Sequence, residues 1–230
     1  MEIEPEITGG SIVLVGSFNP AIFSPDWFIR HGLIRESEVI RDDGKLLIFN
    51  QLAQFALEWC QISVEPHRFV IGSTRDPLVK ICDLTVRTFG EFLPHAPLQQ
   101  LGINREVHFK VKSLEARDRM GFKLAPPSSW GDWEKDLTAK SDRMRGGLKL
   151  LSMQQQVFSE SRTGYIQATV QPSAVITDGA GVFVQVNDHY ESSNPGAGNP
   201  ELLDILESRF EASRVKSDWI VDQIMKLAND

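Results

Sequence analysis

The chain has 230 residues, of which 41% are hydrophobic and 24% charged, and it carries a net charge of −7. The acidic balance argues against a general binder of nucleic acid or of anionic membranes, because contacts with phosphate require Lys and Arg. No apolar run approaches the roughly 18 residues of a membrane span, and the acidic Met1–Glu6 segment is unlike a signal peptide, so we expect a cytoplasmic protein with no membrane association.

A chain of this length can bury a full hydrophobic core without a disulfide or a structural metal. We expect a single α+β domain over residues 1–230. Cys60 and Cys82 lie in apolar stretches, which predicts two buried, reduced thiols and agrees with a cytosolic environment.

The N-terminal part predicts a strand followed by a short helix. Residues 11–18 are rich in β-formers and end at the turn signal Asn19-Pro20. Ser24 is a typical N-cap residue and Pro25 suits the first helical position, so we expect the helix to begin at Pro25.

Two strands are expected next. Residues 46–59 alternate in polarity with a period of two, which predicts one half-buried antiparallel strand. Its buried side would carry Phe55, Leu57 and Trp59. A further strand is expected at residues 68–72.

Asp76 and Pro77 predict the start of a longer helix, in which apolar positions recur every three or four residues. These positions make an inner stripe of Leu78, Ile81, Cys82, Thr85 and Phe89. Beyond this helix, Val107, Phe109 and Val111 alternate with polar residues and predict an amphipathic strand.

The following part predicts a short helix, an irregular excursion and three strands. Ser113 is expected to cap the short helix, and residues 125–147 have only weak periodicity. The strands are expected at residues 148–158, 163–171 and 181–188.

A long helix is expected to close the chain. Asn199 is expected to cap it, with Pro200 at its first position. Ser217 or Asp218 is expected to interrupt the helix and cap a second segment, with Trp219 packing inward.

The order of the predicted elements is similar in the two halves of the chain. Residues 11–92 give strand, helix, strands and helix, and residues 101–228 give the same order around the excursion. One interpretation is a duplicated unit, although the halves share no residue-level identity. The alternating strands disfavour a doubly wound parallel sheet, so the predicted fold class is α+β, a mainly antiparallel sheet with helices on one face.

Residues 15–20, Val-Gly-Ser-Phe-Asn-Pro, resemble the opening of the nucleotidyltransferases that continue into a His-x-Gly-His motif. The two histidines of that family stabilise the transferred phosphate, and the matching positions here hold Ile22 and Pro25. Without the imidazoles this chemistry is missing, so we expect the turn not to bind nucleotide. A phosphate-binding loop, a dinucleotide fingerprint and zinc-ligand spacing are also missing, and we expect no cofactor, no metal site and no catalytic residues.

An aromatic and basic segment of the excursion is the main candidate for a binding surface. It consists of Trp130, Trp133, Lys140, Arg143, Arg145 and Lys149. Such a segment anchors a protein partner or stacks on nucleic-acid bases, or else its tryptophans belong to the core and its basic residues are solvated. We expect a protein partner, with a homo-oligomer as a further option, and do not favour nucleic acid.

An alternative site would be assembled from scattered polar residues. Arg105 and His108 lie on the predicted central strand, and Asp188 and His189 lie at the end of a later strand, before a loop rich in Gly and Pro. Loops at strand ends often carry function. With such a site, the protein would be an enzyme or a component that acts on nucleic acid.

Three segments of the C-terminal half carry a family resemblance. They are Gly102–Arg105, Val182–Tyr190, and the long helix with Leu206, Phe210 and Trp219. They resemble a broad bacterial family of uncharacterised, sporadically distributed proteins of similar length. The resemblance implies this fold and a bacterial origin, and such proteins are associated with accessory or defence loci. Our leading hypothesis is a non-catalytic binding or assembly protein of a bacterial accessory system, such as a toxin-neutralising or anti-phage defence partner.

Overall fold

The computed structural model describes residues 4–41, 46–141, 144–159, 162–177, 179–194 and 200–228. The strands of its main sheet are β1 (Ile7–Gly16), β2 (Val39–Ile40), β3 (Leu47–Phe49), β4 (Leu52–Leu57), β5 (Gln61–Glu65), β6 (Arg68–Ser73), β7 (Leu98–Lys110), β10 (Leu151–Ser159), β11 (Arg162–Pro172) and β12 (Gly181–Glu191). A separate hairpin is formed by β8 (Lys140–Ser141) and β9 (Met144–Arg145).

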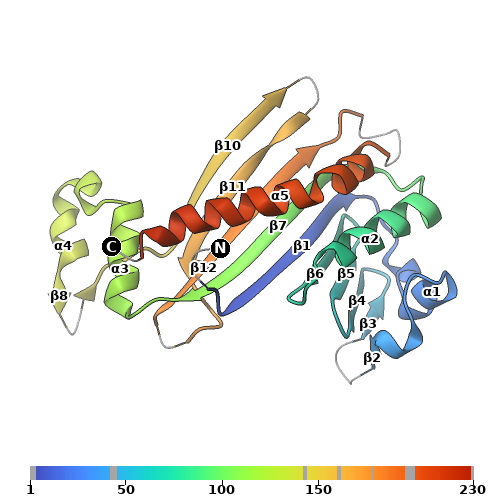
Figure 1. Cartoon of the computed structure of the whole chain (residues 1–230), viewed down its shortest axis with the longest axis horizontal. Coiled ribbons are helices and arrows are strands. Elements are labelled where there is room, and N and C mark those ends of the chain that lie inside the picture. The colour runs from blue at the N-terminus through green and yellow to red at the C-terminus, as the bar shows by residue number, and fades with distance from the viewer. Residues whose placement is uncertain are drawn as a thin grey trace.

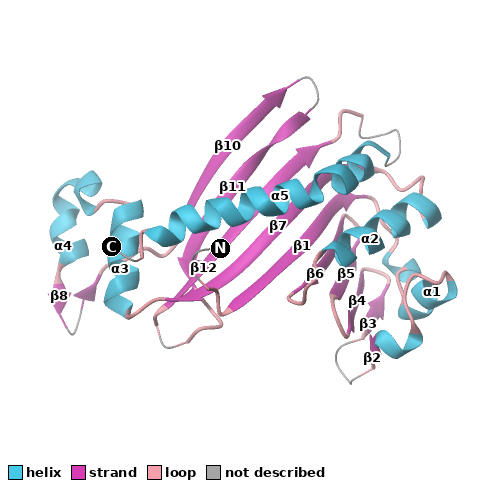
Figure 2. Ribbon diagram, viewed as in Figure 1, coloured by secondary structure: helices cyan, strands magenta, loops and turns pink. Residues whose placement is uncertain are grey.

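The α-helices are α1 (Pro25–Arg30), α2 (Val79–Arg87), α3 (Leu114–Leu124), α4 (Glu134–Thr138) and α5 (Pro200–Lys226). Shorter helical turns are η1 (Pro20–Ile22), η2 (Glu36–Glu38), η3 (Thr88–Phe92) and η4 (Pro127–Trp133). The helices pack against one face of the sheet, with α5 running across it, while α3 and α4 lie at one end of the molecule (Figures 1 and 2). Among the described helices, none is long and apolar enough to cross a membrane.

The main sheet is one antiparallel sheet of ten described strands, which confirms the predicted α+β class. Its order is β10-β11-β12-β7-β1-β6-β5-β4-β2, with β3 paired to β4. The first strands of the two halves, β1 and β7, lie side by side at the centre. Outward from β1 follow β6, β5 and β4, and outward from β7 follow β12, β11 and β10. In each half the last strand therefore lies next to the first. This order is what two similar units related by a two-fold axis would give, and the duplication itself stays a prediction.

Local signals correctly placed the two short helices. The Ser24 hydroxyl accepts a hydrogen bond from the backbone N–H of Trp27 at 3.2 Å, so it caps α1. The Ser113 hydroxyl accepts one from the N–H of Ala116, also at 3.2 Å, and caps α3. Each bond satisfies a backbone donor that a helix start leaves without an intrahelical partner.

The prediction of one strand over residues 46–59 is wrong. The chain reverses at Asn50 and Gln51 to give the hairpin of β3 and β4. Phe55 and Leu57 are buried as predicted, whereas Trp59 lies beyond β4 and is half-buried. The turn contains neither Gly nor Pro, so the sequence carried no strong signal for it.

The start of α2 also differs from the prediction. The helix begins at Val79, and its N-cap position is held by Leu78, which makes no side-chain cap, so Asp76 does not cap it. The predicted inner stripe is confirmed, because all five of its residues are buried. Cys60 and Cys82 are buried free thiols, as predicted, and burial raises the pKa of each to about 12.

The last helix is continuous, and the predicted interruption at Ser217 or Asp218 is wrong. Ser217 is buried against the sheet, and the Asp218 carboxylate accepts a hydrogen bond from Arg105. Trp219 is 53% exposed, with the Lys216 ammonium 3.9 Å from its ring centroid, so it does not pack inward. Asn199, the predicted cap, lies outside the described residues.

Two hydrophobic clusters lie between the sheet and the helices, and α5 packs on both. Leu206 and Phe210, near its start, join the first cluster, which also contains many aromatic side chains of the N-terminal half. Val221 and Met225, near its end, join the second cluster beside Phe109. One helix therefore connects the cores of the two halves.

Arg105 anchors α5 to the central strands. Its Nε donates to Asp218 Oδ1 at 2.7 Å and its Nη1 donates to the Gly9 carbonyl at 2.8 Å. The other oxygen of Asp218 accepts a hydrogen bond from Arg214 Nη1 at 3.3 Å. Arg105 is buried, so the carboxylate compensates a charge that has lost most of its water.

Replacing Asp218 with Ala is expected to lower the free energy of unfolding by about 3 kcal/mol, because it leaves the Arg105 charge buried without its partner. Glu211→Ala on the same helix is the control. Glu211 pairs with Arg214 on the surface, and its loss should cost less than about 1 kcal/mol. Urea unfolding of both variants makes the comparison, and equal losses would contradict the anchoring role.

Candidate functional site: a groove on the helix-free face

The face of the sheet opposite the helices is here called the open face. Because side chains alternate along a strand, the pairing registers fix which residues share this face. Ser11 faces Asn104, Asn104 faces Asn187, and Asn187 faces Gln167 on the next strand. Extended to both sides, this central row consists of Gln61, Gly72, Ser11, Asn104, Asn187, Gln167 and Gln154.

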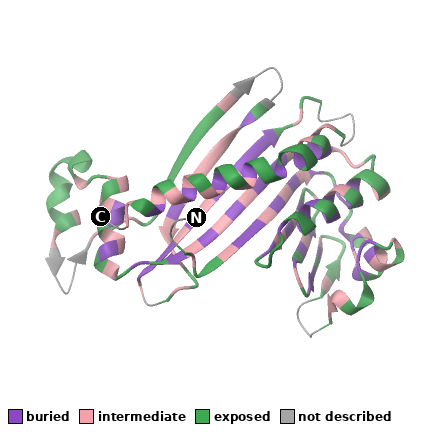
Figure 3. Cartoon of the chain, in the orientation of Figure 1, coloured by how far each residue is buried: buried purple, intermediate pink, exposed green. Residues whose placement is uncertain are grey.

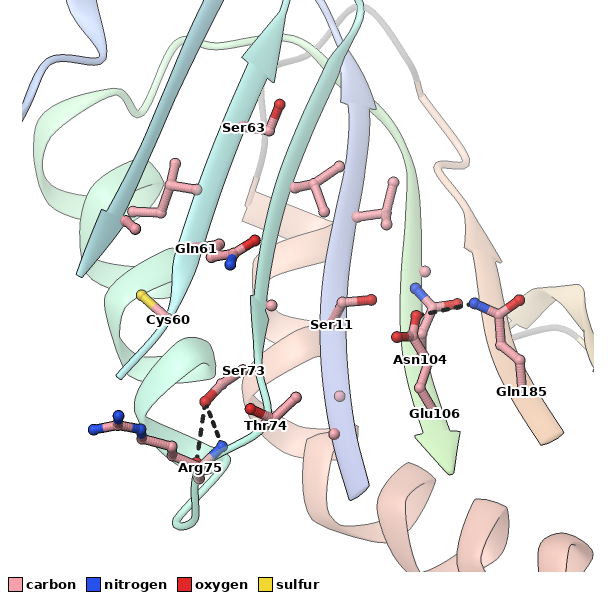
Figure 4. Close-up of a pocket in the computed structure, with 18 of the residues that line it drawn as sticks. Ser11, Cys60, Gln61, Ser63, Ser73, Thr74, Arg75, Asn104, Glu106 and Gln185 are labelled. Carbon is pink, nitrogen blue, oxygen red and sulfur yellow. Dashed lines mark hydrogen bonds between the residues drawn. The ribbon is translucent and has the colours of Figure 1, made fainter. Parts of the chain in front are cut away.

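A groove of about 870 Å³ runs over the open face, lined by residues of β1, β2, β4, β5, β6, β7, β11 and β12. Carboxamide side chains dominate its polar lining: Gln54, Gln61, Gln100, Asn104, Gln167, Gln185 and Asn187. Figure 4 shows Gln61, Ser11, Asn104 and Gln185 arranged across the strands from β5 to β12. The groove therefore presents both hydrogen-bond donors and acceptors across most of the sheet.

The middle of the groove has a polar atom without a partner. Asn187 lies close above Gly102, where an added Cβ would come within 3.0 Å of the Asn187 oxygen. Among the described residues, this buried oxygen finds no hydrogen-bond donor. An unpaired buried acceptor is costly.

The charges of the lining are balanced. Arg68 and Arg75 are offset by Glu58 and Glu106, and the Glu106 carboxylate accepts a hydrogen bond from Gln185 Nε2 at 3.0 Å. A groove with equal numbers of each sign does not favour a polyanion or a polycation.

Two histidines of the groove pack against aromatic rings. His189 stacks on Tyr165 with ring centroids 4.4 Å apart, and His108 lies 4.6 Å from Phe183. Burial lowers the pKa of both imidazoles, and the effect outweighs the nearby carboxylates, which act in the opposite direction. Both rings are therefore neutral at neutral pH.

His108 and Ser173 form a close Ser–His contact, with the Ser173 hydroxyl 2.9 Å from His108 Nδ1. The same hydroxyl oxygen accepts hydrogen bonds from the N–H groups of Val175 at 3.2 Å and Ile176 at 3.0 Å. These bonds occupy its lone pairs and leave its own hydrogen for His108. The pair therefore holds the turn after β11 and is not arranged as an activated nucleophile.

The structure does not bring the four residues of the alternative polar site together. Arg105 points to the helix side, and so does Asp188, which accepts a hydrogen bond from the Tyr190 hydroxyl at 2.9 Å. His108 and His189 lie on the open face, but His189 faces Gly102, six residues from His108 along β7. That separation is about 20 Å at the rise of a strand.

The aromatic residues of the excursion lie at the surface. Trp130 and Trp133 are each 54% exposed and contact one another edge to face, with centroids 5.8 Å apart. This exposure removes the interpretation that they belong to the core. Lys149 is also exposed, Arg143 lies outside the described residues, and the side chains of Lys140 and Arg145 are not described.

The segment that resembles nucleotidyltransferases has a local structural role. The Asn19 side chain caps η1 by accepting a hydrogen bond from the N–H of Ala21 at 3.2 Å. Pro20, the first residue of η1, and Phe23, which follows it, are both buried. In the part of the chain that the structure describes, no group of three or more His, Cys, Asp or Glu side chains is placed to hold a metal ion.

No family model matches the sequence, and no curated protein matches it. The resemblance to the sporadically distributed bacterial family therefore stays a prediction.

Acidification is expected to destabilise the protein through His189 and His108. Their pKa values in the folded state lie below 6.5, so the unfolded chain binds protons first as the pH falls. The stabilisation that comes from keeping both imidazoles neutral is fully present above about pH 6.5. It is lost as the pH falls through their pKa values in the folded state. In His189→Asn, the difference in unfolding free energy between neutral and mildly acidic urea titrations should be smaller than in the wild type. His95→Asn, at an exposed loop position, is the control and should keep the wild-type difference.

Proposed function

We propose that this protein is a non-catalytic binding protein that holds an extended segment of a protein partner in the groove of the open face. The observation that carries the proposal is the groove itself, which is lined by amides and balanced in charge. Its volume of about 870 Å³ lies within the range of ligand sites, about 300–1,000 Å³.

The chemistry of the groove suits a polypeptide. A peptide group offers one donor and one acceptor, and each Asn or Gln side chain can pair with both. A phosphate polymer would need an excess of Lys and Arg, which neither the lining nor the net charge of −7 supplies. Protein is therefore the occupant that the lining favours.

The exposed tryptophans of the excursion support a second contact with the partner. Trp and Arg are enriched among the residues that dominate binding energy at protein interfaces. Trp130 and Trp133 lie side by side and are accessible, as an anchor for a partner requires.

The biological setting rests on the family resemblance alone. It supports a bacterial accessory system, in which this protein would neutralise a toxin or take part in anti-phage defence. The two free buried thiols support a reducing compartment such as the cytoplasm.

Groove binding is tested by photo-crosslinking after native purification. A photoreactive amino acid at Gln61, in the exposed part of the groove, should capture one partner, whereas the same residue at Ala212, on the outer side of α5, should not. Asn104→Arg should weaken binding of that partner by at least about tenfold, because a long charged side chain fills the middle of the groove. Ala212→Arg adds the same charge elsewhere and should bind normally. Wild-type affinity in a folded Asn104→Arg variant would refute the groove as the site.

The excursion gives an independent prediction. Replacing Arg143 and Arg145 with Ala should change the free energy of unfolding by only about 0.5 kcal/mol. If the excursion contacts the partner, the same change should weaken binding by about 2 kcal/mol. Trp130→Ala and Trp133→Ala should behave alike, since both rings are half exposed. Calorimetry with the purified partner gives the affinities, and unchanged binding in all of these variants would restrict the interface to the groove.

A further inference from the structure

The two edges of the sheet differ in length. At one edge lie β2, with two residues, and β3, with three. Short edge strands give another chain little to pair with. At the other edge lies β10, with nine residues, which pairs with β11 on one side and with no other described strand. A long row of backbone N–H and C=O groups is therefore available along β10.

The sequence of β10 contains none of the usual protection of an edge strand. Leu-Ser-Met-Gln-Gln-Gln-Val-Phe-Ser has no charged residue, no Pro and no Gly. Its register with β11 runs without a bulge from Leu151, opposite Val170, to Ser159, opposite Arg162. Charge, Pro and bulges are the features that prevent edge strands from pairing with another chain.

The side chains of this edge are exposed as well. Residues 152–156 are all exposed, and the strand is largely green in Figure 3. Met153 is 67% exposed, and Leu150, just before the strand, is 59% exposed. An uncovered edge with large apolar side chains is a surface that pairing would bury.

We propose that β10 pairs with β10 of a second copy of this chain, antiparallel about a two-fold axis at Gln155. The two sheets then form one continuous sheet that crosses the dimer. The axis stands perpendicular to the sheet, so the helix sides of both copies stay on one face and the open faces on the other.

A second copy is favoured because the strand is complementary to itself in this register. Gln155 faces Gln155 of the other copy, and Met153 faces Val157 in two equivalent pairs on the helix side. On the open face, Gln154 faces Gln156, and these two amides already bond within the strand, with Gln154 Nε2 donating to Gln156 Oε1 at 2.8 Å. A shift by two residues in either direction would set Met153, which is 67% exposed in the single chain, against a polar residue, Gln155 or Ser159.

The dimer extends the proposed function without depending on it. Gln154 is the last member of the central row, and in the paired strands it lies opposite Gln156 of the other copy, so the central rows of the two copies end on neighbouring strands, offset by two residues. The joined open face could then hold two partner segments or one longer segment.

Charge substitutions at the axis test the proposal with the full-length protein. In Gln155→Lys two positive charges face each other across the axis, and in Gln155→Glu two negative charges do. Each variant alone should dimerise about tenfold or more weakly than the wild type. A mixture of the two should form a heterodimer, which native mass spectrometry separates by mass, while light scattering over a dilution series gives the dissociation constants.

The same substitutions at Gln171, on β11 one strand inside the edge, are the matched controls and should leave the wild-type dimer intact. Asn104→Arg should also remain a dimer, so a failure of the groove proposal would not be mistaken for a failure of this one. A wild-type monomer at all concentrations, a dimer insensitive to charge at Gln155, or a mixture without preference for the heterodimer would each overturn the proposal. Crosslinking of β10 to a different protein, with a monomeric wild type, would do the same.

Discussion

The antiparallel pairing of β1 with β7 is the constraint on which the rest of the structure depends. It sets Ile12 against Ile103 on the buried side and Ser11 against Asn104 on the open face. Each half then adds its remaining strands outward from this pair, so the groove extends over strands of both halves. Because the side-chain period of a strand is two, a slip of one residue would exchange core and groove residues, and the buried isoleucines fix the register.

The long helix α5 gives this sheet its rigidity. Its first turns fill the aromatic core of the N-terminal half, and its last turns fill the valine-rich core of the C-terminal half. Arg105 and Asp218 join helix and sheet at the centre. A sheet of so many strands keeps its shape only if the halves do not bend about the central pair, and a helix that packs on both cores resists that bending. The helix thus also keeps the groove on the opposite face in one shape.

Several elements were predicted correctly from signals among neighbouring residues, whereas features that depend on distant residues were not predicted. The alternation of Val182, Val184 and Val186 and the caps at Ser24 and Ser113 are local, and they predicted strands and helices correctly. Asp is a common N-cap residue, so Asp218 led to the wrong prediction of a helix start. Its carboxylate instead pairs with Arg105, which lies 113 residues away in the sequence. Arg105 and His108 are three positions apart on one strand, and side chains alternate along a strand. This spacing could have shown that they lie on opposite faces of the sheet. The groove could not be predicted, because its amides come from five strands and gather only once the pairing registers are known.

The position of α5 in the chain has a consequence for biosynthesis. Every described strand of the sheet is translated before the 27 residues of this helix. Until then the apolar side of β7 and β12 has no cover, and the guanidinium of Arg105 has no carboxylate. At about 5–20 residues per second, translation of the helix itself takes about 1–5 s. Exposed strands with bare apolar faces are prone to aggregate, so the nascent chain spends its most vulnerable period just before its last helix is complete.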